Sequence, residues 1–425
     1  MAFRSRTHTN PTRRGAVTVW VLVGLIVIVG IVAIGMDGGR MLEKRRQCQA
    51  VADAAALAGA ASVFHLDITG NAYNYSLKLS AAQSAGLSLA AANGFNNDGI
   101  TSTVTINYHP NSGAFAGQVN FVEAIVQYNL PKSFGGIFTN NNLPVSARAV
   151  AVGRPVQIGI IALQQSGANA FQFNAKGNMT VNSGAVFVNS NDAAAFAVTD
   201  SGTVSADNYS VTGNYTKSSG TIYGQVYTNM QRTPDPLLSL AVPNSGSLSV
   251  QSSSPMVINS GSTTLGPGVY KGGINIGGTA TVSLQPGVYV MQGGGFQVGG
   301  GANVTGTTPL IYNTTGTAAP GPISINTSGA FTFSAYTTGA YQGVSFFQDR
   351  SQTQTVTITG NGNTHIGGAV YAPAAPINLA GNYTTGSDTL GTAYICATMQ
   401  VTGLGNITID TTINPLIVPQ VTLVE

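Results

Sequence analysis

The sequence predicts a transmembrane helix at the N-terminus, a small α+β domain after it, and a mainly β body folded as a parallel (right-handed) β-helix. Three observations predict this class. Residues 15–36 are uncharged and mostly apolar, charged residues make up 7% of the 425-residue chain, and the distal body consists of short alternating stretches between glycine-containing turns. Soluble domains carry about 25% charged residues. The predicted division is 1–14 (basic cytoplasmic tail), 15–36 (membrane span), 37–154 (α+β domain) and 155–425 (β-helix-like body).

The apolar run from Gly15 to Met36 is long enough to cross a bilayer. Its 22 residues, at about 1.5 Å each, cover a hydrocarbon core of roughly 30 Å. A cleaved secretory signal is the alternative, but such signals have an apolar stretch of about 7–15 residues and a small-residue cleavage site. The length favours a retained anchor. Basic residues flank both ends of the span, so charge alone leaves orientation open; we expect the arginine-rich tail inside the cell and the body outside.

The anchor is expected to continue as a helix from Met41 to Phe64, because this stretch is rich in alanine and contains no proline. Ala50, Ala54, Ala58 and Ala61 are spaced to share one smooth stripe. Two interpretations stay open: the helix packs on its own domain, or the stripe packs against the anchors of partner proteins.

The α+β domain is predicted from the alternation of residues after this helix. A second helix is expected over Ser76–Asn93, closed by Gly94 in the left-handed conformation. Strands are expected at Thr101–Tyr108, Phe121–Tyr128 and Leu143–Val152, and a turn or short helix at Phe134–Phe138.

The body shows repeats at spacings near 20 residues, which fit one coil of a solenoid. Pro267-Gly268-Val269-Tyr270 recurs 19 residues later as Pro286-Gly287-Val288-Tyr289, and Gly-Asn turns at Gly360, Gly381 and Gly405 lie 21 and 24 residues apart. Outward Ser, Thr, Asn and Gln can stack between coils where like charges would repel. A β-sandwich with conventional hairpins is the competing fold.

The N-terminal region combines several motifs in order: Arg13-Arg14-Gly15, the apolar span, Met36-Asp37-Gly38-Gly39-Arg40, and the alanine-rich helix containing Asp53. Over about residues 13–62 this combination resembles the TadE/TadG-like family of Flp (tight-adherence) pilus assembly, and the chain looks closest to the TadG branch. It implies a single-pass inner-membrane protein with an extracytoplasmic body and no catalytic residues. A looser resemblance, over roughly residues 155–412, links the body to those appended to TadG-like proteins of some environmental bacteria.

Candidate chemistry is sparse, and we predict no catalytic, cofactor-binding or metal-binding residues. Glycosidase or lyase chemistry needs paired carboxylates, but the acids of the body are scattered. Asp192, Asp200 and Asp207 are the one local group and are expected to be turn residues. Asp349-Arg350 is expected to be a surface ion pair and His365 a coil-surface residue. His65 and His109 lack ligand-like neighbours in sequence, Cys48 and Cys396 are too few for a disulfide framework, and the Gly293–Gly295 and Gly299–Gly301 runs are expected to form coil corners.

Three function classes follow. The leading one is a membrane-anchored extracytoplasmic structural component associated with Flp/Tad pilus assembly, pilus anchoring or adhesion. Its partners would be the membrane, other Tad or envelope proteins and a possible surface glycan, with no nucleic acid, because there is no extended basic face. The second is a solenoid binding module for carbohydrate or ice, with Thr-rich rungs such as Thr355–Thr359. The third, a carbohydrate-active enzyme, needs converging acids.

One departure from the family bears on processing. Prepilins and TadE-type pseudopilins carry a glutamate at the start of the apolar segment, and Gly15–Trp20 contains none. We therefore predict that mass spectrometry of the membrane-extracted protein finds the peptide bonds around Arg13–Ala16 intact. A homogeneous new N-terminus in this region would show instead that the protein is processed like a pilin subunit.

Overall fold

The computed structural model describes residues 14–66, 74–132, 142–382 and 388–425, and the chain divides into two compact units. Unit 1 comprises the N-terminal part as far as Pro155 together with Pro419–Glu425; unit 2 comprises Val156–Val418. Unit 2 is therefore inserted, in sequence, between two parts of unit 1. The turn or short helix expected at Phe134–Phe138 lies outside the described residues.

Unit 1 contains a long helix, α1 (Arg14–Leu66), a second helix, α2 (Tyr75–Ala92), and an antiparallel sheet of β1 (Ser102–Tyr108), β2 (Phe121–Leu130) and β3 (Leu143–Ala162). Both helices and all three strands were predicted, within a few residues at most ends. Gly94 has φ +84° after the end of α2, as expected of a left-handed cap. The prediction placed the end of β3 at Val152, but the strand continues for ten residues into unit 2.

The helices of unit 1 pack closely on the sheet because small residues meet it. A Cβ atom on Gly59 would lie 2.8 Å from Val122 Cγ1, and one on Gly86 would lie 2.8 Å from Ile106 Cδ1. Alanines fill most of the remaining contact, so the backbones of α1 and α2 approach each other and the sheet. This explains why an alanine-rich sequence forms the core.

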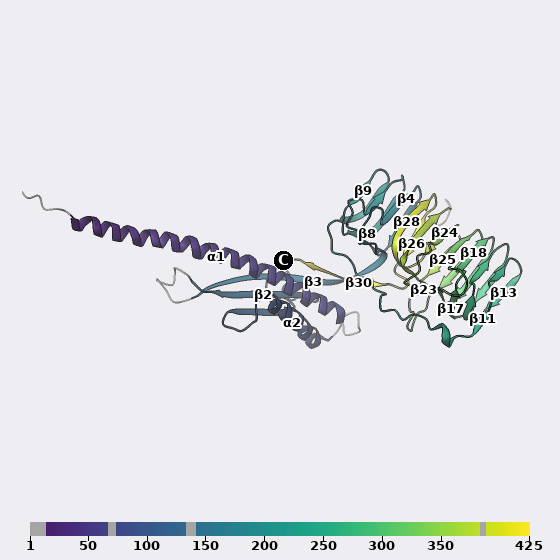
Figure 1. Cartoon of the computed structure of the whole chain (residues 1–425), viewed down its shortest axis with the longest axis horizontal. Coiled ribbons are helices and arrows are strands. Elements are labelled where there is room, and N and C mark those ends of the chain that lie inside the picture. Colours follow the sequence, from purple (N-terminus) through teal and green to yellow (C-terminus); the bar gives the residue numbers. More distant parts are fainter. Residues whose placement is uncertain (1–13, 67–73, 133–141, 383–387) are drawn as a thin grey trace, which may run out of the picture. The chain divides into compact units, whose positions relative to one another are not determined.

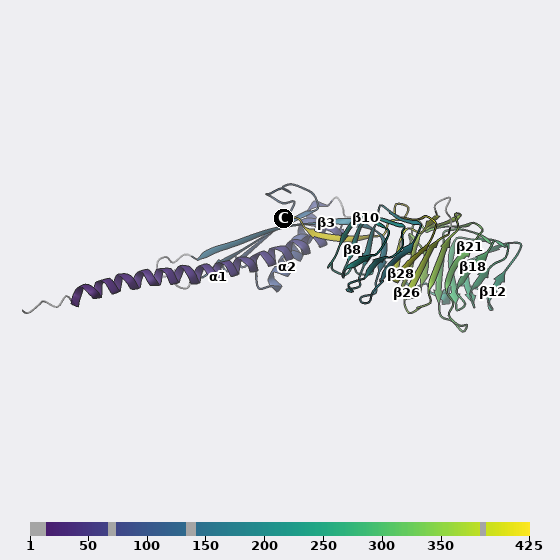
Figure 2. The same cartoon turned by 90° about the horizontal axis from the view of Figure 1, so that it is seen from above.

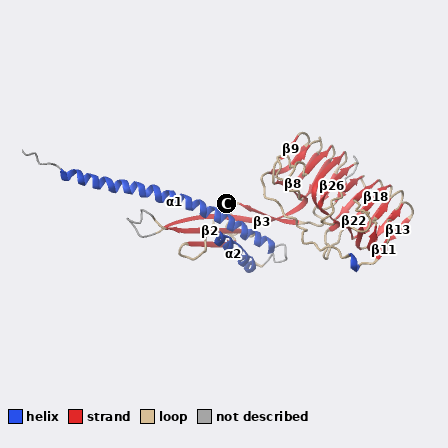
Figure 3. Cartoon of the chain, in the orientation of Figure 1, coloured by secondary structure: helices blue, strands red, loops and turns tan. Residues whose placement is uncertain are grey.

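Unit 2 is a solenoid of stacked parallel strands (Figures 1 and 2), and the strand pairings divide it into three faces. Except for a short 3₁₀ turn, η3 (Ser245–Ser247), its described residues are strands and loops (Figure 3). Every strand pairing among the described residues of unit 2 is parallel, which confirms the predicted class; the hairpins of a sandwich would have given antiparallel pairs.

We call the three faces of unit 2 faces A, B and C, and the strands of each face follow one another from the end at β11–β13 to the end at β9 and β10. Face A consists of β11 (Val250–Ser252), β14 (Gly268–Lys271), β17 (Gly287–Gln292), β20 (Pro309–Thr314), β23 (Val344–Gln348), the first parts of β26 (Ala369–Gly381) and β28 (Tyr394–Gly403), the end of β3, β6 (Ala185–Val188), and the ends of β8 (Thr203–Val211) and β10 (Thr221–Tyr227). Face B consists of β12 (Met256–Ile258), β15 (Ile274–Ile276), β18 (Phe296–Gly300), β21 (Ile323–Thr327), β24 (Val356–Gly360), the ends of β26 and β28, β4 (Phe171–Ala175), β7 (Phe196–Val198) and β9 (Tyr215–Lys217). Face C consists of β13 (Ser262–Leu265), β16 (Thr281–Leu284), β19 (Asn303–Thr307), β22 (Phe331–Ser334), β25 (Thr364–Gly367), β27 (Asp388–Leu390), β29 (Ile407–Asp410), β5 (Asn178–Asn182), and the first parts of β8 and β10.

The coils do not follow the chain order. The chain first builds the coils that end in β9 and β10, then runs to the far end of the solenoid at β11, and from there builds coils back to the start (Figure 1). The last coil of the return, in β28 and β29, pairs with β3, β4 and β5 at the beginning. The segment between the end of β10 and the start of β11, residues 228–249, connects the two ends of the stack. In this segment Arg232 donates to the carbonyls of Asn189 and Gln165.

The interior is apolar, and aromatic rings stack between coils. The Phe171 and Phe196 rings are 5.1 Å apart, and Phe196 and Tyr209 are 5.2 Å apart, nearly parallel in both cases. The Gly293–Gly295 run forms a corner between β17 and β18, as expected. All three residues have positive φ, and a Cβ atom on Gly294 would lie 1.8 Å from the Gly272 carbonyl oxygen.

One charged cluster ties the sheet of unit 1 together. The side chain of Glu123 is fully buried and accepts from Arg148 Nε at 2.6 Å and from Asn107 Nδ2 at 2.7 Å. Arg148 also pairs with Glu425, Nη1 to Oε1 at 2.9 Å. Burial raises the pKa of Glu123, but these donors outweigh burial and hold the pKa below its ordinary value of 4.5.

Replacing Arg148 with methionine should destabilise this sheet, because the Glu123 carboxylate would stay buried without its cation. We expect a loss of about 3 kcal/mol, or roughly 100-fold faster hydrogen exchange of the β2 amides in detergent-solubilised protein at pH 7. Glu425→Gln, at a part-exposed partner, is the control and should cost less than about 1 kcal/mol. Because the folded-state pKa of Glu123 is lowered, its contribution exists above pH 4.5 and disappears as pH falls through the folded-state pKa. Equal exchange in both variants would contradict this role.

Candidate membrane helix and binding face

Helix α1 has two parts with different surroundings. The apolar side chains of its first part lie on the surface; Trp20 is 76% exposed and Ile34 78% exposed. From Cys48 onward, one side of the helix is buried against unit 1. Among the described residues, α1 is the helix long and apolar enough to cross a membrane, and its most apolar window is almost entirely uncovered by protein. Such a surface is stable in lipid and costly in water.

The second part of α1 packs on its own domain, which was one of the two interpretations left open by the sequence. The side of the helix that is buried is not the stripe of Ala50, Ala54, Ala58 and Ala61. The buried side consists of Val51, Ala52, Ala55, Ala56, Gly59 and Ala60. In the predicted stripe, Ala50 and Ala61 are exposed, and Ala54 and Ala58 are half-buried. The sequence has small residues on both sides of the helix, so spacing alone could not tell which side faces the sheet.

Most acids of the body accept hydrogen bonds from nearby groups. Asp192 accepts from Ala194 N at 2.8 Å, and Asp200 from Ser201 N at 2.7 Å. Asp388 is buried and accepts from Gly362 N and Thr364 N at 3.0 and 2.9 Å. Asp207 is exposed. Within the described ranges, no group of three or more His, Cys, Asp or Glu side chains could hold a metal ion.

Asp349 and Arg350 bind different partners. Asp349 accepts from the hydroxyls of Tyr312 and Ser351, and Arg350 donates to the carbonyls of Leu237 and Leu240 at 2.9 and 2.8 Å. Arg350 Nε also donates to the Tyr371 hydroxyl at 2.9 Å. Tyr371 in turn donates to Asp235 at 2.8 Å. Arg350 and Tyr371 thereby hold the segment that crosses between the two ends of the solenoid, a role that the sequence did not indicate.

The remaining histidines and cysteines singled out in the sequence are His65, His109, Cys48 and Cys396. The His109 ring contacts the Tyr75 ring edge-on and the Tyr108 ring at a tilt, and burial, followed by the charge of Lys78, lowers the pKa of His109. The side chain of His65 lies outside the described residues. Cys48 and Cys396 are buried free thiols. Burial raises the pKa of the Cys396 thiol, which disfavours reaction as a thiolate.

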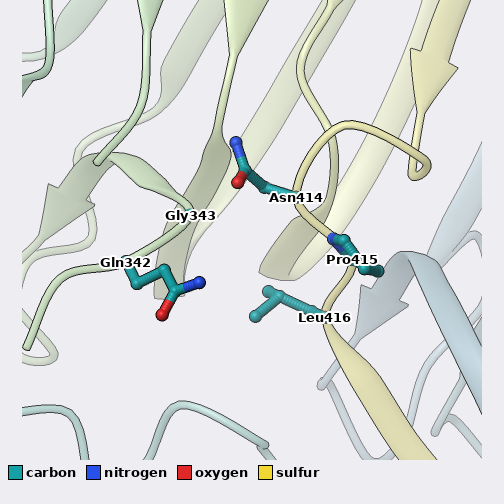
Figure 4. A pocket seen from close by; sticks show the side chains of 5 residues that line it. All are labelled: Gln342, Gly343, Asn414, Pro415 and Leu416. Atoms are coloured by element: carbon teal, nitrogen blue, oxygen red, sulfur yellow. The ribbon is translucent and has the colours of Figure 1, made fainter. Parts of the chain in front are cut away.

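A pocket of about 330 Å³ lies in unit 2, lined by Gln342, Gly343, Asn414, Pro415 and Leu416 (Figure 4). None of the described residues that line it has an ionisable side chain. The Asn414 amide donates to the Gly367 carbonyl at 3.0 Å, so part of its hydrogen-bonding capacity is already used. The pocket provides shape and amide groups, not an acid or base.

Face C carries a regular outward column of side chains that, except for one histidine, bear hydroxyl groups. Paired positions on neighbouring strands place one residue per coil; the residues are Thr264, Ser283, Thr305, Thr332, His365, Thr389, Thr408, Thr180 and Ser205. We call this set the threonine column. Each member is exposed or half-buried, whereas the residues one position earlier on several strands, such as Val282 and Val304, are buried. Neighbouring strands lie about 4.8 Å apart, so the column presents evenly spaced hydroxyls.

The Thr-rich rung predicted from sequence lies on a different face. Thr357 belongs to face B, whose outward column is mainly amide: Asn275, Gln297, Ser324, Thr357, Asn378, Gln400 and Gln172. Thr359 is buried. The threonine column escaped sequence reasoning because its members come from separate strands in an order that does not follow the chain.

The comparison with known families adds a separate observation about α1. Residues 15–62 match the family of putative Flp pilus-assembly TadE/G-like proteins. The resemblance predicted for the N-terminus is confirmed at this level, while the TadG branch and the resemblance of the body stay predictions. No curated protein and no solved structure matches the chain. The TadE/G-like segment thus coincides with the surface-exposed part of α1 and most of the part packed on unit 1.

Proposed function

We propose that this protein is a stationary, membrane-anchored structural component of a bacterial Tad/Flp pilus-assembly system, and that its solenoid acts outside the cytoplasm in pilus anchoring or surface adhesion. The observation that carries this proposal is the TadE/G-like match at residues 15–62 on a helix whose first part is apolar and uncovered. The proposed membrane is the cytoplasmic (inner) membrane, crossed once, with residues 1–14 inside. The partners would be other Tad or envelope proteins.

The continuity of α1 supports an anchor in preference to a cleaved signal. The helix runs without a break from Arg14 to Leu66, and its second part forms much of the core of unit 1. The residues that connect the two parts, around Gly38 and Gly39, are helical. The helix therefore offers no loop there at which a protease could separate the apolar part from unit 1. In this proposal unit 1 stands directly on the membrane span, and the body has no enzymatic role.

The threonine column supports a second candidate function, a binding module for carbohydrate or ordered water. Evenly spaced hydroxyls on a β-face can hydrogen-bond a ligand that repeats along its own length. This function is compatible with the first, since an adhesin needs a ligand-binding surface. A surface glycan is the partner that we favour.

Replacing residues 156–418 with a short Gly-Ser linker tests the leading function. This design keeps Pro419–Glu425, which belong to unit 1 and supply the Glu425 partner of Arg148; truncation at residue 155 would remove them. We expect the shortened protein to remain in the membrane fraction and surface attachment to fall strongly. Pilus number on the cells should be scored separately by microscopy. Unchanged attachment and unchanged piliation would refute an envelope role for the solenoid.

Removing hydroxyls from the threonine column tests the binding function. Thr305→Val with Thr332→Val keeps the branched shape and deletes two donors, so we expect roughly 30-fold weaker retention on polysaccharide purified from the bacterium's own envelope, at about 1 kcal/mol per hydrogen bond. The matched control is Gln297→Val with Ser324→Val, on the corresponding strands of face B. Equal retention of both variants would argue against the threonine column as the ligand surface.

A further inference from the structure

The two ends of the solenoid are open. At one end, β11, β12 and β13 pair with β14, β15 and β16; at the other, β9 and β10 pair with β7 and β8 (Figure 1). In the part of the chain that the structure describes, no further strand is paired on the outer side of either end. Each end therefore presents unpaired backbone N–H and C=O groups. Open parallel coils normally need a cap or a partner.

The end formed by β11–β13 lacks the charged residues that commonly protect a sheet edge against pairing. No charged residue occurs from Leu237 to Tyr270. Val250 is 54% exposed and Val257 is 58% exposed. Val257 occupies the outward column of face B, where the next coils carry Asn275, Gln297 and Ser324. This terminal coil thus replaces a polar side chain with an exposed apolar one at its edge, a pattern typical of an interface.

The opposite end is protected by a lysine. Lys217 stands in an inward column of face B that is otherwise apolar; its members include Ile258, Ile276, Val298, Phe173 and Val198. Lys217 is exposed, and its ammonium group donates to the Gly220 carbonyl at 3.4 Å. An inward-pointing charge on a terminal strand is a common device against edge-to-edge association. Covering this end with another coil would bury the ammonium against apolar side chains.

The solenoid already contains a junction between coils that are not consecutive in the chain. Strand β28 pairs with β4 over five residues, from Met399–Phe171 to Gly403–Ala175, and β29 pairs with β5 over four. The partners are 228 residues apart in sequence. Gln400 Nε2 donates to Gln172 Oε1 at 3.3 Å across this junction. Two coils of this protein can therefore associate edge to edge, through backbone pairing and side-chain ladders, even when they are not consecutive in the chain.

We propose that the charge-free end formed by β11–β13 binds the same end of a second copy of this chain. A two-fold axis relates the two copies and reverses the strand direction of one relative to the other. Strand β12 therefore pairs antiparallel with β12 of the second copy, and Val257 of one copy faces Val257 of the other. Head-to-tail stacking would instead bring Lys217 against Ile258. Because the contact uses the same end of both copies, assembly stops at a dimer and no fibre forms. This dimer does not depend on the pilus role or on the threonine column.

Single cysteine variants of the full-length protein in detergent test the geometry. Val257→Cys should form a disulfide-linked dimer under mild oxidation, because the two-fold contact brings the two thiols together. Thr216→Cys is the matched control: it occupies the same outward column on β9 at the other end and should stay monomeric on a non-reducing gel. Cys48 and Cys396 have no exposed surface, so they should not compete. A mixture of the two variants that cross-links only to each other would overturn the proposal in favour of head-to-tail stacking.

A charge substitution tests whether this end drives association. Val257→Lys should weaken the dimer at least about tenfold by mass photometry in detergent, whereas Thr216→Lys should leave it unchanged. Val257 is exposed, so the circular dichroism of both variants should match that of the parent. A monomeric parent protein, or a dimer that resists Val257→Lys, would overturn the proposal; the second result would place the contact elsewhere, such as on α1.

Discussion

Stacking of identical backbone positions at about 4.8 Å is the constraint on which the body of this protein depends. Each coil places its side chains directly over those of the next, so a charge in one coil meets whatever occupies the same column in its neighbours. Like charges at this spacing repel strongly where water is excluded. Columns of threonine, serine, asparagine and glutamine avoid that cost and can hydrogen-bond along the stack. The scarcity of lysine and glutamate follows from this geometry.

The same constraint explains how the chain can fold in an order that differs from its sequence. A coil edge offers the same backbone groups whichever segment supplies it, so the returning coil in β28 and β29 can pair with β4 and β5 as well as any consecutive coil does. The entry and exit of unit 2 then meet, as the hydrogen bond from Ile158 N to Leu416 O at 2.8 Å shows. Insertion of a solenoid between two parts of another unit requires neighbouring ends, and this arrangement supplies them.

Sequence reasoning recovered the features that depend on local pattern. The apolar span, the alanine-rich helix, the strands of unit 1 and the parallel class of the body each follow from periodicity or composition over a short window. It could not recover features that depend on which distant segments meet. The buried side of α1 could not be assigned because small residues occupy both sides, and the order of the coils was not recognisable because paired strands such as β29 and β5 share no distinctive local signal. Arg350 was expected to pair with its neighbour, whereas it donates to two carbonyls more than 100 residues away and to the Tyr371 hydroxyl.

The surface that remains after stacking limits the kind of recognition available to the body. The threonine column offers hydroxyl groups and one histidine, so binding along it would depend little on salt and would come from many weak, evenly spaced hydrogen bonds. A single hydrogen bond contributes about 1 kcal/mol, which cannot hold a small monomeric ligand firmly. A polymer that spans several coils gains from each additional contact without the cost of a new encounter. A rigid, nearly neutral column therefore suits a repeating partner such as a surface polysaccharide better than a single small molecule, and this favours adhesion over catalysis as the role of the solenoid.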